Sequence, residues 1–185
     1  MRLGVYVGSF DPVHKGHIKV INYLLENDYV DKVLVIATQD YWHKKNITDL
    51  SDRLNMLKKY ANDNIIIDTD CNNYQFTYEI LNELKNRYPQ TELKLIIGSD
   101  HLASFHKWQH LDELLKYPIL VLPRGDFEAN NISSPFVLVR DFTYLNISSS
   151  FIRQEISKKH FKNLKEYLDQ PIIDYILDHN LYGGN

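Results

Sequence analysis

The sequence predicts an α/β fold: a doubly wound parallel sheet followed by a small helical part at the C-terminal end. Two observations support this prediction. Short apolar runs rich in β-branched residues recur along the chain, and segments with apolar residues at helical spacing separate them. Strands and helices therefore alternate, which is the pattern of a parallel sheet covered by helices on both faces.

Six apolar runs predict the strands. They are continuous rather than alternating, as expected for strands buried on both faces. The runs are LGVYV at 3–7, KVLVIA at 32–37, IIID at 65–68, LKLIIG at 93–98, ILVLP at 119–123 and FVLVR at 136–140. Ligands of such a sheet bind in the crevice beyond the carboxyl ends of the strands.

Between these runs lie segments whose apolar residues follow helical spacing. It is clearest in three sets of apolar residues: Ile18, Ile21, Leu24 and Leu25; Leu54, Leu57 and Tyr60; and Ile80, Leu81 and Leu84. From Ser148 onward the chain changes character, and SFIRQEI, NLKEYL and PIIDYILDHNLY predict three short helices. Pro171 suits the first turn of the last helix.

Length and composition predict one globular domain over residues 1–185, because no linker long or polar enough to separate domains is visible. The segment 125–134 is predicted to be a mobile loop without an assigned role. Monomeric and homo-oligomeric assemblies both stay open.

Charge and cysteine content exclude some classes of function. The 21 lysines and arginines against 24 acidic residues give a net charge of −3, so no overall basic field attracts nucleic acid. The single cysteine, Cys71, excludes an internal disulfide and is expected to be a small core or surface thiol. No apolar run approaches the roughly 20 residues that span a bilayer, and no signal-peptide pattern opens the chain. We therefore expect a cytoplasmic, soluble protein without a membrane contact.

The segment GSFDPVHKGH at 8–17 is the first candidate site. If a strand ends near Val7 and a helix begins near Gly16, this turn lies at the carboxyl edge of the sheet, against the positive end of a helix dipole. Such a place binds anions. Gly8 would let the backbone approach a ligand, and Gly16 would permit a conformation closed to other residues. His14 and His17 would present two imidazoles to one phosphate.

Other motifs that bind phosphate or metal are absent. Neither a GxGxxG after the first strand nor a GxxxxGK[ST] loop occurs, so the dinucleotide and Walker patterns do not apply. Zinc ligation by His14 and His17 lacks a third ligand at a recognisable spacing. His101, His106 and His110 look like a metal array but fit surface histidines better. We expect no metal site made by the protein alone.

The HxGH spacing after GSFDP resembles the signature of the HxGH nucleotidyltransferase superfamily, which has a Rossmann-like nucleotidyltransferase fold. A second segment, ISSSFIR at 147–153, resembles the ISSTxIR motif of the same superfamily. Ser148 and Ser149 stand where a helix would begin, and the planar guanidinium of Arg153, one turn further, suits phosphate oxygens. The resemblance implies catalytic roles for His14, His17 and Arg153.

A third segment, LIIGSDHLASFHKWQHLDELL at 95–115, is similar to nicotinate and nicotinamide mononucleotide adenylyltransferases. In that family the matching Gly98 and Asp100 bind adenosine, and Trp108 stacks on the pyridine ring. The chemistry agrees, since a carboxylate accepts hydrogen bonds from ribose hydroxyls and an aromatic face stacks on a flat ring. The alternatives are a core position for Trp108 and a helix cap for Asp100.

Weaker matches extend the resemblance to WHKK at 42–45, SDRLNML at 51–57, YQFTYEIL at 74–81 and LPRGD at 122–126. Together the matches imply two sets of binding residues. ATP would contact Gly8, Ser9, Phe10, His14, His17, Gly98, Asp100, Ser148, Ser149 and Arg153, and the mononucleotide would contact Lys44, Thr77, Trp108 and Arg124.

The resemblance implies an adenylyltransferase of NAD biosynthesis that joins ATP and nicotinate mononucleotide to give deamido-NAD and pyrophosphate. It implies Mg²⁺ held mainly by the ATP phosphates, since this ion keeps waters and substrate oxygens. Nicotinamide mononucleotide as the acceptor and another enzyme of the same fold, such as the phosphopantetheine adenylyltransferase, stay open. So does a regulatory module that binds nucleotide without turnover.

Overall fold

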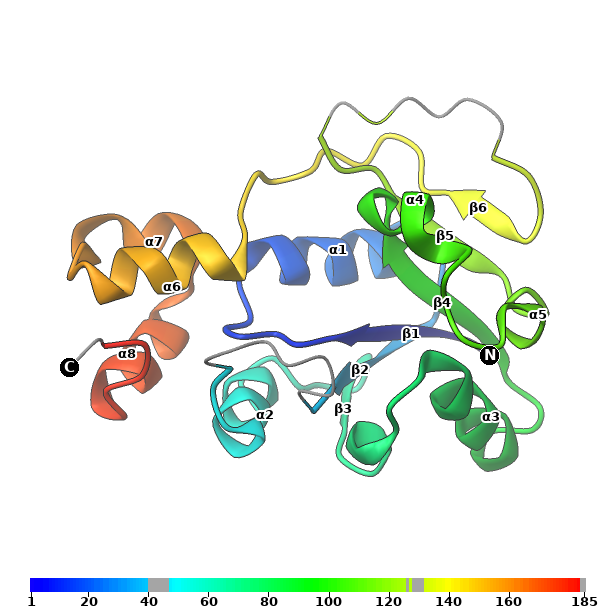
Figure 1. The fold of residues 1–185 in the computed structure, drawn as a ribbon, viewed down its shortest axis with the longest axis horizontal. Coiled ribbons are helices and arrows are strands. Elements are labelled where there is room, and N and C mark those ends of the chain that lie inside the picture. The colour runs from blue at the N-terminus through cyan, green and yellow to red at the C-terminus, as the bar shows by residue number, and fades with distance from the viewer. Residues whose placement is uncertain (40–46, 126, 128–131, 184–185) are drawn as a thin grey trace.

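A parallel sheet lies at the centre of the protein (Figure 1). The protein is described from a computed structural model that covers residues 1–39, 47–125, 127 and 132–183. Within these residues the sheet has six strands in the order β3-β2-β1-β4-β5-β6. Their bounds are β1 Arg2–Gly8, β2 Lys32–Ala37, β3 Ile65–Asp68, β4 Glu92–Gly98, β5 Ile119–Leu122 and β6 Phe136–Leu138. All six predicted strands are confirmed.

The last two strands end earlier than the apolar runs that predict them. β5 stops at Leu122, before Pro123, because proline has no N–H to donate to a strand ladder. β6 is an edge strand of three residues, and only Val139 continues its hydrogen bonding, to the carbonyl of Val121 at 2.9 Å.

The strand order creates a switch point between β1 and β4. From β1 the chain moves outward through β2 and β3, then crosses to β4 on the other side and moves outward again. At such a point the carboxyl ends of two adjacent strands open a crevice. The expected ligand site therefore lies between the ends of β1 and β4.

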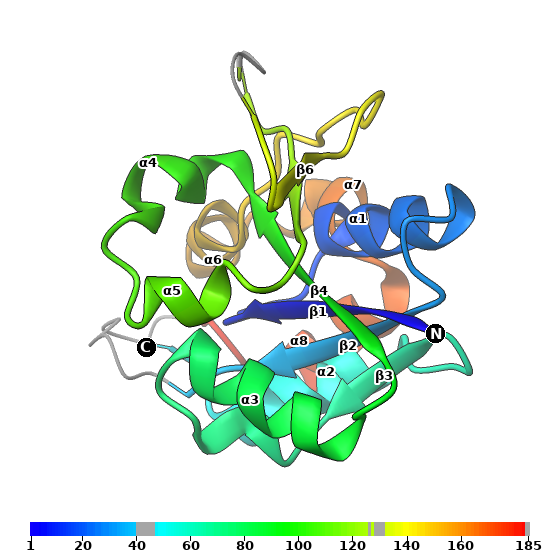
Figure 2. The same cartoon turned by 90° about the vertical axis from the view of Figure 1, so that its right-hand side faces the viewer.

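Both faces of the sheet are buried, which explains the continuous apolar runs. Val33 and Val35 of β2 belong to one core cluster, and Leu34 and Ile36 belong to the other. The first cluster includes side chains of α1 (Lys15–Glu26) and α2 (Leu50–Lys58), and the second those of α3 (Thr77–Arg87). Figure 2 shows α1 and α3 on opposite sides of the sheet.

Short helices connect β4 to β5 on the same face of the sheet as α3. They are a 3₁₀ turn at Ser99–His101, α4 at Leu102–Phe105 and α5 at Leu111–Leu114. Another 3₁₀ turn, Cys71–Asn73, precedes α3. Cys71 is a core thiol, and burial together with Asp68 raises its pKa to about 12. It is therefore protonated at neutral pH and is not a reactive thiolate.

The predicted C-terminal helical part is confirmed. It consists of α6 (Ser149–Ser157), a 3₁₀ turn (Phe161–Asn163), α7 (Leu164–Tyr167) and α8 (Gln170–Asp178), with Pro171 in the first turn of α8 as predicted. These helices pack on the first core cluster beside the N-terminal end of α1 (Figure 1). The tail is thus brought next to the turn that follows β1.

No helix within the described ranges combines the length and the apolar character that crossing a membrane would require.

Candidate functional site

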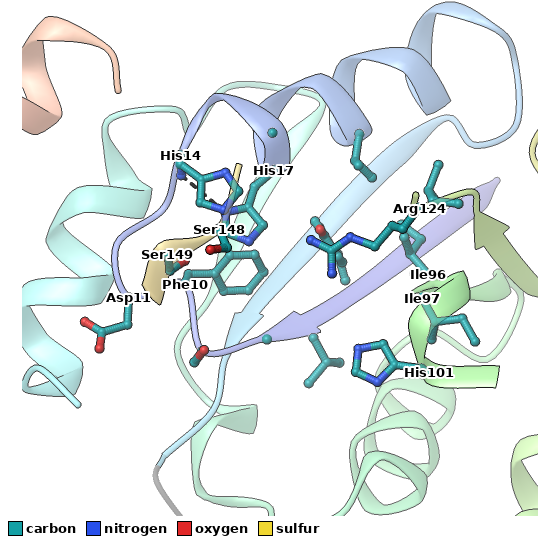
Figure 3. Close-up of a pocket in the computed structure, with 18 of the residues that line it drawn as sticks. Phe10, Asp11, His14, His17, Ile96, Ile97, His101, Arg124, Ser148 and Ser149 are labelled. Carbon is teal, nitrogen blue, oxygen red and sulfur yellow. Dashed lines mark hydrogen bonds between the residues drawn. The ribbon is translucent and has the colours of Figure 1, made fainter. Parts of the chain in front are cut away.

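A cavity of about 390 Å³ opens at the carboxyl edge of the sheet, between the ends of β1, β4 and β5 and the first turns of α1 and α6 (Figure 3). The switch point between β1 and β4 therefore coincides with this cavity. Most of the predicted site residues line it: Gly8, Ser9, Phe10, His14, His17, Thr77, Gly98, Trp108, Arg124, Ser148, Ser149 and Arg153.

Two predicted residues are not among those on the wall. The carboxylate of Asp100 pairs with the lining residue Arg124, with 2.9 Å between Oδ2 and Nη1. Lys44, with the rest of the WHKK match, lies outside the described residues.

The turn after β1 is shaped by Phe10. Its φ of 48° lies in the left-handed region, which is disfavoured for a bulky residue and costs about 1–3 kcal/mol. Packing offsets this cost, because the buried ring contacts Tyr6 at 5.3 Å and His17 at 4.9 Å between centroids. A Cβ on Gly8 would come within 3.2 Å of the same ring. Gly8 thus leaves room for Phe10.

Arg53 links the turn after β1 to two other segments of the chain. Its side chain is almost fully buried and donates hydrogen bonds to the carbonyl oxygens of Ser9 at 2.8 Å, Thr38 at 2.8 Å and Thr48 at 2.9 Å. Three separate segments are therefore held at fixed distances from one another. This explains why an arginine stands in SDRLNML, a role that the sequence alone did not show.

His14 and His17 are neighbours, as the HxGH spacing predicts. Their rings stack with centroids 3.7 Å apart, and His14 is 2 % exposed. The backbone N–H of His14 donates to Nδ1 of His17 at 3.2 Å. In its neutral form His17 therefore carries its proton on Nε2 and can donate it to a ligand.

The expectation for Gly16 was wrong in its reason. Gly16 lies in the first turn of α1 and is not among the residues with positive φ. The reason for a glycine at this position is steric, because a Cβ there would lie 3.0 Å from Cε1 and Nδ1 of the His14 ring. The second glycine of the motif is needed to seat the first histidine.

Both histidines are uncharged at neutral pH. Burial, assisted by the positive charge of Arg124, lowers the pKa of His14 to about 4. Burial, together with His14 and Arg124, lowers the pKa of His17 well below its ordinary value. Within the described residues, Nδ1 of His14 has no hydrogen-bond partner. A bound anion would raise both pKa values and would strengthen the hydrogen bonds that the rings donate.

This shift predicts a pH dependence of stability. The folded-state pKa of His14, about 4, lies below its ordinary 6.5, so the unfolded chain takes up the proton first. Protonation of His14 therefore does not reduce the free energy of unfolding above about pH 6.5, and it reduces it progressively as the pH falls from 6.5 toward 4. Replacing His14→Asn should remove about 2 kcal/mol of the loss in unfolding free energy between ~pH 7 and ~pH 4.5. Urea denaturation without nucleotide measures this difference.

The control for this measurement is His106→Asn, which changes an exposed histidine away from the cavity wall. It should keep the wild-type pH profile. An unchanged profile in His14→Asn would show that the buried ring does not titrate as described.

The second motif meets the first. Ser148 caps α6 by accepting a hydrogen bond from the Phe151 N–H at 3.2 Å, as its predicted place at a helix start requires. Ser149 donates from Oγ to the carbonyl oxygen of Pro12 at 2.9 Å. Arg153 donates to the carbonyl oxygen of Asp11 at 2.6 Å. The first turn of α6 is therefore fixed against the turn after β1.

At the β4 end, Asp100 and Arg124 lie across Gly98. A Cβ on Gly98 would overlap Oδ1 of Asp100 and come 2.8 Å from Cδ of Arg124, so a larger residue there would displace these side chains. The guanidinium of Arg124 also lies 5.0 Å from the ring centroid of Tyr144. The alternative role of Asp100 as a helix cap is wrong, because Asp100 lies inside the 3₁₀ turn Ser99–His101, and the N-cap residues of that turn and of α4 are Gly98 and His101.

Trp108 lines the cavity and also packs on the second core cluster, a position that is compatible with stacking on a ligand and with a core role. Its ring contacts Phe105 at 4.9 Å and His101 at 5.8 Å between centroids. His101 is exposed, as predicted, yet it too lines the cavity, whereas His106 and His110 are not among the lining residues.

The sequence did not single out several lining residues, among them Tyr6, Asp11, Tyr144 and Ser150. Asp11 and Ser150 stand inside the two quoted motifs, so a signal was present for them. Tyr6 occupies an ordinary strand position. Tyr144 lies in a segment without regular structure, where no periodicity indicates which way a side chain points.

Comparisons with known proteins give a consistent result. The family described as cytidylyltransferase-like matches residues 5–155. A protein of Flavobacterium johnsoniae named "Probable nicotinate-nucleotide adenylyltransferase" is 34% identical over 193 residues, covering 98% of this chain and 99% of that protein. The nicotinate-nucleotide adenylyltransferase of Bacillus subtilis is 28% identical over 190 residues, covering 98% of each.

Among solved structures, the nicotinic acid mononucleotide adenylyltransferase of Plasmodium falciparum complexed with NaAD superposes with a TM-score of 0.80. The superposition covers 98% of this chain and 97% of that one, at 22% identity. This likeness shows that the fold is shared.

Proposed function

The chain belongs to the cytidylyltransferase-like family, within it to the nicotinate-nucleotide adenylyltransferases, and we propose that it joins ATP and nicotinate mononucleotide to give deamido-NAD and pyrophosphate. This reaction is a step of NAD biosynthesis. The observation that supports the proposal most strongly is the meeting of both motifs at one cavity, with His14, His17, Ser149 and Arg153 on its wall.

The proposed chemistry is a substitution at phosphorus. A phosphate oxygen of the mononucleotide attacks the α-phosphorus of ATP, the new P–O bond forms, and the bond to the β-phosphate oxygen breaks in line with it. Pyrophosphate leaves with that electron pair. The attacking phosphate is already anionic near neutral pH, so the reaction needs positioning and charge stabilisation rather than a general base.

The chain offers donors to the triphosphate from two helix starts. The positive end of the α1 dipole, Nε2–H of His17, the first turn of α6 and the guanidinium of Arg153 face the cavity. The charge that develops on the departing pyrophosphate would be stabilised by these groups. His14 is buried and stacks on His17. It would hold the His17 ring in place and would interact with the same triphosphate.

The other end of the cavity would receive the two nucleosides. The carboxylate of Asp100 is about half exposed, at 48%, so it can accept a ribose hydroxyl while it stays beside Arg124. We propose that Trp108 stacks on the pyridine ring, with Thr77 and Arg124 on the mononucleotide side and Lys44 as a further contact.

Divalent metal fits this site as a partner of the substrate. Of the carboxylates nearest the cavity, Asp100 is paired with Arg124, and Oδ2 of Asp11 lies 3.7 Å from Nη1 of Arg153. Within the described ranges no group of three or more His, Cys, Asp or Glu side chains is placed to hold an ion. Triphosphate oxygens and water would therefore hold Mg²⁺, which would supply positive charge to the leaving pyrophosphate. The chain's own part is to orient the phosphates that bind it.

Substitution of the aromatic wall tests the mononucleotide end. Trp108→Ala should weaken mononucleotide binding by about 1–3 kcal/mol, since a stacked base contributes about that much, and should weaken ATP binding much less. Calorimetric titration with each substrate measures the two losses. Trp108→Phe keeps a stacking face and should retain most of the affinity. Equal losses for both substrates in Trp108→Ala would argue against stacking and for a purely structural tryptophan.

A substrate screen tests the function itself. The purified protein is given ATP with nicotinate mononucleotide, nicotinamide mononucleotide or phosphopantetheine, and pyrophosphate release is followed. We expect the highest kcat/KM with nicotinate mononucleotide. Turnover with phosphopantetheine alone would assign another enzyme of this fold, and no release with any acceptor would favour the regulatory module.

The remaining predictions stay proposals. We propose that residues 1–185 act as one domain in the cytoplasm, where a reaction that consumes ATP would fit. The prediction that nucleic acid is not bound depends on the net charge of −3. Monomer and homo-oligomer both stay open.

A further inference from the structure

We propose that Tyr182, close to the C-terminal end of the chain, is a positioning residue for this site: its hydroxyl holds the Asp11 carboxylate so that Arg153 presents its guanidinium to the cavity. The inference rests on the proposed function for its kinetic consequences. Its structural basis is a chain of contacts that leads from Tyr182 to Asp11 and from Asp11 to Arg153, three residues that are far apart in the sequence.

The first contact fixes Asp11. The hydroxyl of Tyr182 donates to Oδ1 of Asp11 at 2.7 Å, and the backbone N–H of Thr48 donates to Oδ2 at 3.3 Å. Asp11 is 2 % exposed, so its carboxylate depends on these donors rather than on bulk water. Each of its two oxygens therefore has a neutral hydrogen-bond donor.

The second contact sets Arg153. Its Nη1 donates to the carbonyl oxygen of Asp11 at 2.6 Å, and its Nη2 donates to Oγ of Ser150 at 3.2 Å. The distance from Nη1 to Oδ2 of Asp11 is 3.7 Å, too long for a direct hydrogen bond. Neutral oxygens thus anchor the guanidinium. Its positive charge is less compensated than in a bidentate ion pair, and N–H groups are left for phosphate oxygens.

Loss of the Tyr182 hydroxyl would change how Asp11 interacts with Arg153. A buried carboxylate oxygen without a donor is unfavourable, and the nearest cation is the guanidinium of Arg153. A small movement would turn the 3.7 Å approach into a direct ion pair. Arg153 would then face Asp11, and its charge would be partly cancelled. Tyr182 therefore acts on the phosphates through two other side chains.

The backbone around Tyr182 is consistent with a fixed contact. After α8 the chain turns back through Asn180 at φ 49° and Tyr182 at φ 60°, in the left-handed region, which asparagine tolerates and which is unfavourable for tyrosine. The N–H of Leu181 bonds to the carbonyl oxygen of Ile176 at 2.9 Å and closes the end of the helix. This turn directs the tyrosine ring onto the first core cluster, with its hydroxyl toward Asp11. Burial and the nearby Asp11 raise the pKa of Tyr182, so the hydroxyl stays a donor around neutral pH.

The test compares two tyrosines that both donate to an aspartate. Tyr182→Phe removes the hydrogen bond to Asp11, and Tyr175→Phe, on α8 and away from the cavity wall, removes a 2.8 Å hydrogen bond to Asp52. In Tyr182→Phe we expect kcat to fall about tenfold, with KM for the mononucleotide within about twofold of wild type. Tyr175→Phe should keep the wild-type kcat. Equal loss of kcat in both variants, or none in Tyr182→Phe, would overturn the proposal.

A second comparison shows whether Tyr182 acts through Arg153. In an Arg153→Ala background, Tyr182→Phe should change kcat by less than about twofold, because the group that it positions is gone. A full tenfold effect in that background would assign Tyr182 some other role.

Binding of the unreactive analogue α,β-methylene-ATP separates this inference from the proposed function. Tyr182→Phe should weaken its binding several-fold, while Tyr175→Phe should not. If the wild-type protein binds the analogue but converts neither mononucleotide, the proposed function fails and this comparison still decides the role of Tyr182. If the wild-type protein does not bind the analogue, both proposals are wrong.

Discussion

His17→Ala should lower kcat by about a hundredfold to a thousandfold and leave the fold intact, which is the usual effect of removing one donor that stabilises developing charge. The ring presents Nε2–H to the cavity because its Nδ1 accepts the His14 N–H at 3.2 Å. Alanine removes this donor where the triphosphate would lie. Steady-state pyrophosphate release gives kcat, and thermal unfolding reports the fold.

The control for this variant is His106→Ala, which removes an exposed imidazole away from the cavity wall and should keep the wild-type kcat. Turnover of His17→Ala near the wild-type rate would remove His17 from the mechanism. A large loss of thermal stability in His17→Ala would instead show that the stacked ring matters mainly for packing, since it lies 3.7 Å from His14.

Arg153→Ala should lower kcat by about a hundredfold, because it removes both the charge and the planar fork that suits phosphate oxygens. Arg153→Lys keeps the charge without the fork, and an intermediate loss of about tenfold is expected. The alanine variant also loses the 2.6 Å hydrogen bond to the Asp11 carbonyl, so its melting temperature should fall by a few degrees. Parallel measurements of kcat and thermal unfolding separate the two effects.

The matched control is Arg140→Ala, since the side chain of Arg140 is exposed and does not line the cavity. It should keep the wild-type kcat. Full activity in both Arg153→Ala and Arg153→Lys would exclude a role for the second motif in the transition state.

Much of the fold could be predicted because its main cause is local in the sequence. Strands such as β2 are buried on both faces, and their continuous apolar runs record this burial directly. The alternation of strands and helices then restricts the possible topologies. Strand ends were less certain, and Pro123 ends β5 through a missing N–H rather than through polarity.

The composition of the site followed from two short motifs and from one rule of α/β sheets. The turn after β1 and the start of α6 both lie at the carboxyl edge, so His17 and Arg153 line one cavity despite their separation in sequence. Other features depend on contacts that no local pattern encodes. The pairing of Asp100 with Arg124 over Gly98 is one, and the hydrogen bond between Tyr182 and Asp11, 171 residues apart, is another.

A crystal structure with α,β-methylene-ATP and nicotinate mononucleotide is the most direct measurement of the central claim. We expect Nε2 of His17 and the guanidinium of Arg153 to lie within hydrogen-bond distance, about 3 Å, of the same triphosphate. The mononucleotide phosphate should face the α-phosphorus on the side opposite the β-phosphate. A triphosphate bound elsewhere, or reached by only one of the two side chains, would contradict the account.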